Sequence, residues 1–224
     1  MLAGLARMAR YTVSRQVGVA RQRHDAAIAV LREAVALGID RIDTSDFYGP
    51  HVTNQPIRRA LHPYPANLVL VMKFGYRRGA DASWNVARSD DELVAGVHDL
   101  RNPGVDALDV VNLRPGGAHG PDDSAIDEAP GTMRDLQRDG LVRHIGLSTV
   151  SAAQVERAME TTRIVCVQNR YHLAHRDDDA LVDLLAARAV AYVPYFPLGG
   201  FSRRCSPTRS TWRPHRSAQR GSNA

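Results

Sequence analysis

The sequence lacks the features that mark several common classes of protein. Its longest apolar runs, such as Leu68–Met72 and Ile164–Val167, fall far short of the roughly 20 residues that a membrane-spanning helix needs. The N-terminus has no apolar signal segment. The two cysteines, Cys166 and Cys205, support neither a disulfide framework nor a metal site. We therefore expect a soluble, cytoplasmic protein without a bound metal, and a buried Cys166 within its apolar run.

Lysine is nearly absent. Lys73 is the only one, and every other member of the Lys and Arg set is arginine. An ammonium is a compact point charge, whereas a guanidinium is a planar, permanently charged group with a different chemistry. The single lysine of this arginine-rich chain is therefore a candidate functional residue.

The positive charge is unevenly distributed. The net charge is +5, but residues 201–224 carry six arginines and no acidic residue, which leaves residues 1–200 close to neutral. Beyond Phe201, this basic tail has one aromatic residue, Trp212, and it has no helical or strand period. We interpret it as disordered and not as a nucleic-acid-binding segment.

Helical and strand-like segments alternate from about residue 25, and a 44% apolar content over 224 residues is enough for one sizeable core. Strands are predicted at Arg41–Thr44, Leu68–Lys73, Leu108–Leu113, His144–Ser148, Ile164–Gln168 and Val190–Tyr195. Helices are predicted from about Ile28 to Gly38, at about 54–62, after the capping pair Ser89 and Glu92, at about 124–138, after the capping pair Ser151 and Gln154, and at about 178–188. The expected organisation is a weakly structured leader at 1–24, one domain at 25–200 and the tail at 201–224.

Repeated strand–helix units with apolar strands predict a parallel sheet, either doubly wound or closed into a barrel. A doubly wound nucleotide-binding fold needs a glycine-rich turn after its first strand, and no GxGxxG or P-loop pattern occurs. We therefore predict an α/β fold of the (β/α)8 TIM-barrel type. It is incomplete, because only about six of the eight strand–helix units are clear.

Three side chains could perform acid catalysis at the barrel mouth. Asp43 and Tyr48 follow one predicted strand, and Lys73 ends the next. Catalytic groups of β/α barrels lie at these C-terminal strand ends. A phenol with its ordinary pKa of about 10 is a weak acid near neutral pH, and a nearby cation lowers that pKa. The trio predicts a general acid for a substrate carbonyl, with Asp43 compensating the ammonium.

Five segments, taken together and in order, resemble the successive motifs of the aldo-keto reductase superfamily. They are IDTSDFYG at 42–49, VMKFG at 71–75, GLVRHIGLST at 140–149, VQNRY at 167–171 and PYFPLGG at 194–200. The resemblance runs from about residue 25 to 200. It implies reduction of an aldehyde or ketone by hydride transfer from NADPH, catalysed by a tetrad of Asp, Tyr, Lys and His.

The tetrad is matched at three of its four positions. By motif, Asp43, Tyr48 and Lys73 take the first three roles, but Arg114 stands where the family has histidine. A guanidinium is permanently charged and only donates hydrogen bonds. We therefore expect Arg114 to polarise the carbonyl or to bind an acidic substrate.

The resemblance also implies contacts to an NADP cofactor. Ser148 and Gln168 match side chains that hold the nicotinamide carboxamide, Thr149 replaces the usual asparagine, and Tyr195 matches the aromatic that stacks on the ring. The family's adenosine-phosphate segment has no counterpart here.

Two functions remain open on the sequence. The first is an active, monomeric NADPH-dependent carbonyl reductase with a small-molecule substrate and neither a nucleic-acid nor a membrane partner. The second is a truncated, catalytically silent member of the superfamily that lacks full cofactor binding.

Overall fold

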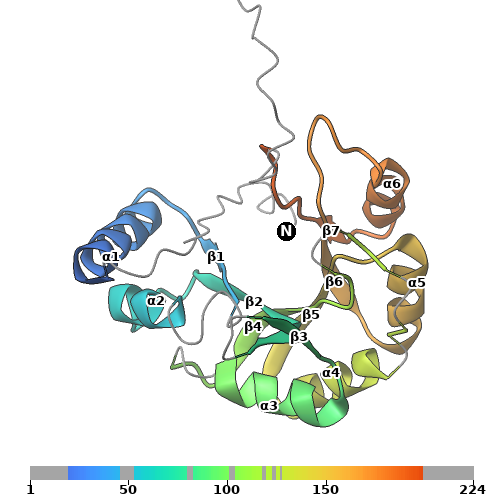
Figure 1. Ribbon diagram of the computed structural model, residues 1–224, viewed down its shortest axis with the longest axis horizontal. Helices are drawn as coiled ribbons and strands as arrows, with labels where there is room; N and C mark the ends of the chain where they lie inside the picture. The colour runs from blue at the N-terminus through green and yellow to red at the C-terminus, as the bar shows by residue number, and fades with distance from the viewer. Residues whose placement is uncertain are drawn as a thin grey trace, which may run out of the picture.

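A computed structural model shows a curled parallel β-sheet with helices on its convex side (Figure 1). The residues that the structure describes are 20–45, 53–79, 83–100, 104–117, 120–122, 125–126 and 128–198. Residues 1–19 of the predicted leader and the whole predicted tail lie outside the described residues. The predicted domain boundaries therefore stay predictions.

The sheet runs in the order β1-β2-β4-β5-β6-β7, and every pair along this path is parallel. Its strands are β1 (Arg41–Asp43), β2 (Val69–Arg78), β4 (Leu108–Leu113), β5 (Val142–Ser148), β6 (Ile164–Gln168) and β7 (Ala191–Tyr192). Because parallel neighbours need a crossover, a helix or loop returns the chain after each strand. The result is the incomplete (β/α)8 arrangement that the sequence predicts.

Helices cover the convex, outer face of this sheet (Figure 1). They are α1 (Ala20–Ala36), α2 (Asn54–Leu61), α3 (Asp90–Leu100), α4 (Ala129–Arg138), α5 (Ala152–Thr161) and α6 (Asp179–Ala187). Helix α5 begins where the sequence predicts it, because Ser151 and Gln154 form a complete capping box.

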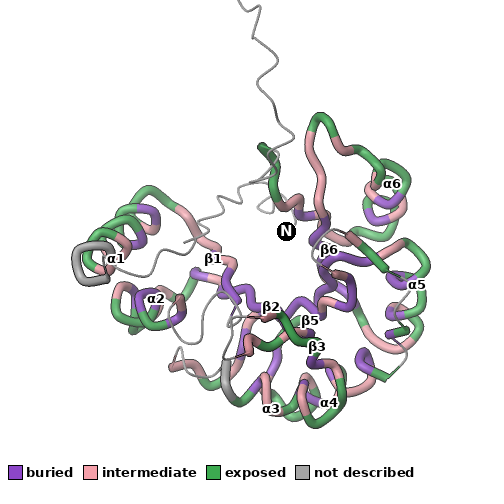
Figure 2. Tube along the Cα trace, viewed as in Figure 1, coloured by how far each residue is buried: buried purple, intermediate pink, exposed green. Residues whose placement is uncertain are grey.

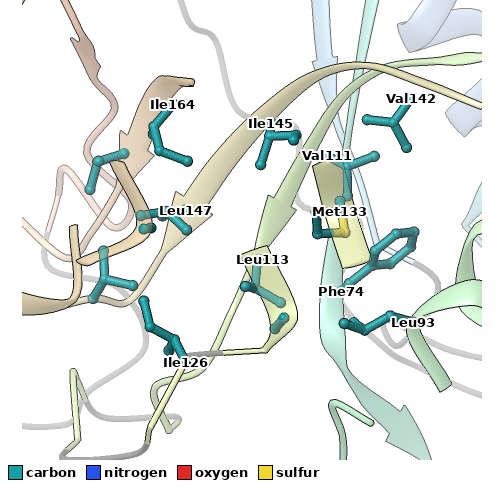
Figure 3. Close-up of a cluster of buried hydrophobic side chains, with 14 of the residues drawn as sticks. Phe74, Leu93, Val111, Leu113, Ile126, Met133, Val142, Ile145, Leu147 and Ile164 are labelled. Atoms are coloured by element: carbon teal, nitrogen blue, oxygen red, sulfur yellow. The ribbon is translucent and has the colours of Figure 1, made fainter. Parts of the chain in front are cut away.

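The main core lies between the outer face of the sheet and helices α3 to α6. In it, Val111 and Leu113 of β4 pack with Leu93 of α3 and Met133 of α4, and all four are at most 1% exposed (Figure 3). Figure 2 shows the burial following the strands and the sheet-facing sides of the helices. A smaller cluster joins α1 and α2 to β1.

Several features differ from the sequence prediction. Helix α1 begins at Ala20, before the predicted start near Ile28 and inside the predicted leader, and β7 covers only two residues of the predicted strand Val190–Tyr195. Strand β2 continues to Arg78 and pairs antiparallel with an unpredicted strand, β3 (Trp84–Ala87). Its short, largely exposed sequence has no buried stripe that would mark it in advance. Helix α4 begins at Ala129, later than the predicted position near 124, and Pro130 lies in its first turn, where a missing backbone N–H costs no helical hydrogen bond.

The sheet is open. Strands β1 and β7 stand at its two ends, and the curl brings these ends toward each other across the concave side (Figure 1). A closed eight-stranded barrel has no such edges. The concave face is therefore less fully enclosed than the helix-covered face.

Candidate active site

Polar side chains gather where the strands end on the concave side of the sheet. Asp43 ends β1, Lys73 lies in β2, Ser148 ends β5 and Gln168 ends β6. Lys73, Ser148 and Gln168 are at most 5% exposed. Buried polar groups on a sheet face require partners, and their partners define the site.

Asp43 and Lys73 form a buried ion pair, as the sequence predicts. Lys73 Nζ donates to Asp43 Oδ1, and the two side chains are only 5% and 8% exposed. Strands β1 and β2 are direct neighbours with Asp43 in register with Val71, which puts the carboxylate beside the ammonium. The negative charge of Asp43 compensates the ammonium in a place where water solvates it poorly.

A third residue joins this pair from the opposite side of the concave face. Gln168 Nε2 donates to Asp43 Oδ2 at 2.6 Å, and the Gln168 side chain is fully buried. The other end of the amide, Oε1, is buried and has no hydrogen-bond partner among the described residues. Gln168 Oε1 is thus a buried acceptor that the described protein atoms leave unsatisfied.

Tyr48 lies outside the described residues. Its predicted place beside Lys73, and with it the predicted general acid, stays a prediction. The described residues supply the carboxylate and the ammonium of the acid corner.

Arg114 lies just beyond β4, where its side chain holds a loop. Its Nη2 donates to the Gly117 carbonyl at 2.8 Å and its Nε to the Gly116 carbonyl at 3.4 Å. The guanidinium carbon lies 5.8 Å from the ring centroid of Tyr76 and 6.0 Å from that of Trp84. The predicted contact between Arg114 and substrate stays a prediction; the contacts seen are with the loop at 115–117 and the β2–β3 hairpin.

The loop at 115–117 is held tightly against the end of β5. A side chain on Gly116 would place its Cβ 2.1 Å from the Thr149 carbonyl oxygen, so only glycine fits there. Thr149 itself has φ +59°, which is unusual for a β-branched residue. Such strained backbone clusters at functional sites, where the surrounding structure holds it in place.

The predicted cofactor residues come together around Thr149. Thr149 N donates to the Gln168 carbonyl at 2.9 Å, and its Oγ1 lies 3.4 Å from Ser148 Oγ and 3.5 Å from the Tyr195 hydroxyl. All four residues therefore lie at the ends of β5 and β6 and just after β7. Their contact with a cofactor stays a prediction.

Sequence reasoning did not identify two buried asparagines near the site. Asn112 faces the concave side in register with Lys73 and accepts a hydrogen bond from Cys166 Sγ at 3.3 Å. Asn169 binds both backbone groups of Val150 and thereby fixes the segment after β5. The available signal for Asn112 was a polar residue near the C-terminal end of a predicted buried strand, where β/α barrels place their functional groups.

Cys166 is buried, as its apolar setting predicts. Desolvation by burial and then the negative charge of Asp43 raise the pKa of its thiol to about 12. The thiol therefore stays protonated at neutral pH and is a poor nucleophile.

A cavity of about 520 Å³ lies along the concave face. Val71, Val110 and Val193 form part of its apolar wall, and Asn112 and Gln168 reach it from the polar cluster. In a closed barrel, layers of inward side chains fill this kind of space.

Within the described part of the chain, no cluster of His, Cys, Asp or Glu has the arrangement of a metal site. The described helices include none with the length and hydropathy of a membrane span.

This geometry corresponds to a known family. A model of the aldo/keto reductase family matches residues 12–218, and the chain belongs to that family. It is 57% identical over 196 residues to pyridoxine 4-dehydrogenase of Escherichia coli, an alignment that covers 86% of this chain and 68% of that protein.

More distant relatives agree with this assignment. The chain is 30% identical over 175 residues to an uncharacterised oxidoreductase of Schizosaccharomyces pombe, with 78% of this chain and 56% of that protein covered. The fold matches the holo form of a Bacillus halodurans aldo-keto reductase with a TM-score of 0.67 and 25% identity, covering 76% of this chain and 57% of the other. The chain thus spans little more than half the length of these two proteins.

Proposed function

We propose that this chain binds NADPH and reduces an aldehyde or ketone to an alcohol by hydride transfer, with Tyr48 as the proton donor. The observation that carries the proposal is the buried Asp43–Lys73 pair at the mouth of a β/α sheet. A structural ion pair is weak evidence alone, because burying two charges costs free energy. Its place at the catalytic end of a family-type barrel favours a chemical role.

The residues present fit the nicotinamide end of the cofactor. The unsatisfied Gln168 Oε1 is an acceptor for the N–H of a carboxamide, and Ser148 lies beside it on the next strand. The Tyr195 ring follows β7 on the same side. When bound, NADPH supplies the hydride that the carbonyl carbon accepts.

The chain's own residues have separable tasks in this proposal. Lys73 provides a positive charge that favours the phenolate form of an adjacent phenol, which makes Tyr48 a better proton donor. Asp43 holds the ammonium in place from β1. Arg114 holds the loop at 115–117 through the Gly116 and Gly117 carbonyls, and so shapes one wall of the barrel mouth.

The substrate proposed first is the 4-aldehyde of pyridoxine. The motivation is the 57% identity to a protein named pyridoxine 4-dehydrogenase. A dehydrogenase that oxidises an alcohol also reduces the corresponding aldehyde, since an enzyme accelerates both directions of one reaction.

One observation favours the alternative, a chain that is catalytically silent. Strands β1 and β7 are the end strands of the sheet that the described residues form, and an open cavity lies between its walls. Incomplete closure would weaken the enclosure that excludes water from hydride transfer.

A titration of the 224-residue chain with NADPH, followed by cofactor fluorescence, tests binding. Loss of absorbance at the NADPH band on addition of the aldehyde then tests turnover. In Tyr48→Phe, kcat should fall by about 10²- to 10⁴-fold, the usual contribution of general acid catalysis, while cofactor affinity is retained. Tyr64→Phe, which removes a phenol near the α1–α2 cluster, is the matched control and should leave kcat unchanged. A folded chain without saturable NADPH binding would support the silent alternative.

A further inference from the structure

We propose that Asp43 has a second task beyond its pairing with Lys73: it is the positioning residue that fixes the orientation of the Gln168 amide. The inference concerns which end of that amide faces the barrel mouth. The orientation of the amide does not depend on the proposed function. The effect of that orientation on cofactor selection does rest on it.

The hydrogen bond between these residues spans the concave face. Asp43 ends β1 and Gln168 ends β6, and β2, β4 and β5 lie between these strands in the sheet. Gln168 Nε2 nevertheless lies 2.6 Å from Asp43 Oδ2. Both groups are buried, so the bond forms where water competes poorly.

Chemistry permits one orientation of the amide. A carboxylate only accepts hydrogen bonds, whereas an amide has a donating NH2 end and an accepting oxygen end. Lys73 Nζ already donates to Asp43 Oδ1, which holds the carboxylate in place. Turning the Gln168 amide over would set two oxygens against each other, so its NH2 must face Asp43.

The free end of the amide is then determined as well. Gln168 Oε1 points away from Asp43 as a buried acceptor without a partner in the described part of the chain. An unsatisfied buried acceptor is costly, and such a group marks a place for a ligand donor. The Asp43–Lys73 pair on β1 and β2 thereby leaves Gln168 Oε1 on β6 as an acceptor, and this acceptor selects a ligand with an N–H group.

The orientation can be tested without any ligand by exchanging donor and acceptor. Gln168→Glu faces Asp43 with a second carboxylate and should lower the urea midpoint of unfolding. Asp43→Asn should lower it too, because Lys73 loses its counter-charge. In the double variant an Asn NH2 faces a Glu carboxylate, and we expect the midpoint to recover at least half of the summed loss.

Asp109 offers a matched control for this cycle. Its carboxylate also accepts from a nitrogen of another strand and from a cation, with Leu70 N and Arg143 Nη1 each at 3.0 Å, but it makes no bond to Gln168. Losses from Asp109→Asn and Gln168→Glu should simply add. Additive losses in the Asp43 cycle as well would overturn the proposal.

Ligand selection provides a second readout. The affinities for NADPH and for its 3-acetylpyridine analogue, in which a methyl group replaces the carboxamide NH2, are compared. We expect the parent to favour NADPH by about tenfold, the usual value of one hydrogen bond. Gln168→Leu should bring the ratio near one, and Asp43→Asn should lower it about threefold because the amide is free to turn.

Tyr195→Leu is the control for ligand selection, since loss of a stacking ring should weaken both nucleotides and keep their ratio. An unchanged ratio in Asp43→Asn would contradict the inference. If the parent binds neither nucleotide, the proposed function fails, while the donor–acceptor exchange still decides whether Asp43 orients Gln168.

Discussion

The two faces of the same sheet are built on different principles. The outer face packs apolar side chains of β2, β4, β5 and β6 against four helices and forms the main core (Figure 3). The concave face has only a small apolar cluster of Val71, Val110, Cys166 and Val193, above which the buried polar residues lie. One face stabilises the fold and the other presents the chemistry.

Alternation within single strands separates these tasks. In β2, Met72 and Phe74 belong to the outer core, while Val71 and Lys73 belong to the concave face. Side chains of successive strand residues point to opposite faces. Substitutions at two adjacent residues of one strand can therefore have different effects. The one on the outer face changes stability, and the one on the concave face changes the chemistry of the site.

The largest expected effect comes from breaking the buried charge pair. Lys73→Met leaves the Asp43 carboxylate buried without its cation, and the free energy of unfolding should fall by about 3 to 5 kcal/mol. Urea unfolding followed by circular dichroism measures the loss. Adding Asp43→Asn should restore part of the loss, because it removes the unpaired carboxylate. A Lys73→Met chain as stable as the parent would show that the buried Asp43 carboxylate does not need the Lys73 ammonium.

Neighbouring valines on β4 compare the two faces directly. Val111 is fully buried in the outer core, whereas Val110 lines the cavity. Val111→Ala should lower the free energy of unfolding by about 2 kcal/mol, through lost burial and a new void. Val110→Ala should cost about half as much, because its side chain already borders empty space. Equal losses in urea unfolding would contradict the contrast between the faces.

The smallest expected effect concerns the thiol of Cys166. Its pKa is about 12 in the folded chain against an ordinary value of 9.0, so folding favours the protonated thiol. This contribution to stability is complete below pH 9 and is lost as the pH rises from 9 toward 12. Between pH 8 and 10 the parent should lose about 1 kcal/mol more stability than Cys166→Ala.

Thiol reactivity checks the same point independently. In a Cys205→Ser background, a thiol reagent at pH 8 should label Cys166 only after urea unfolding, since the folded thiol is buried and protonated. Rapid labelling of the folded chain would show that the concave face is more accessible than the structure indicates.

Much of the fold was predictable because it is encoded locally. The strands Leu108–Leu113 and Ile164–Gln168 have the predicted bounds, since largely apolar segments of this length define strands that are buried on both sides. The Ser151–Gln154 capping box starts α5 at the predicted place. The hairpin formed by β3 was missed because its pairing depends on the extension of β2 and not on a local pattern.

The candidate site was predictable in part. The motif position of Asp43 and the uniqueness of Lys73 identified the ion pair, and the structure confirms that these two side chains meet. The sequence prediction of a substrate contact for Arg114 came from its match to the histidine position of the family's tetrad. Sequence position does not reveal that the Gly116 and Gly117 carbonyls and the ring of Trp84 lie within reach of its guanidinium.

By itself, the sequence determined which segments become strands and helices and which strand ends carry polar groups, because periodicity and capping act over a few residues. The tertiary structure alone decided that Gln168 meets Asp43, since 125 residues of chain separate them. Only the curl of the sheet brings β6 and β1 within a hydrogen bond of each other. That contact determines which end of the Gln168 amide remains free at the barrel mouth.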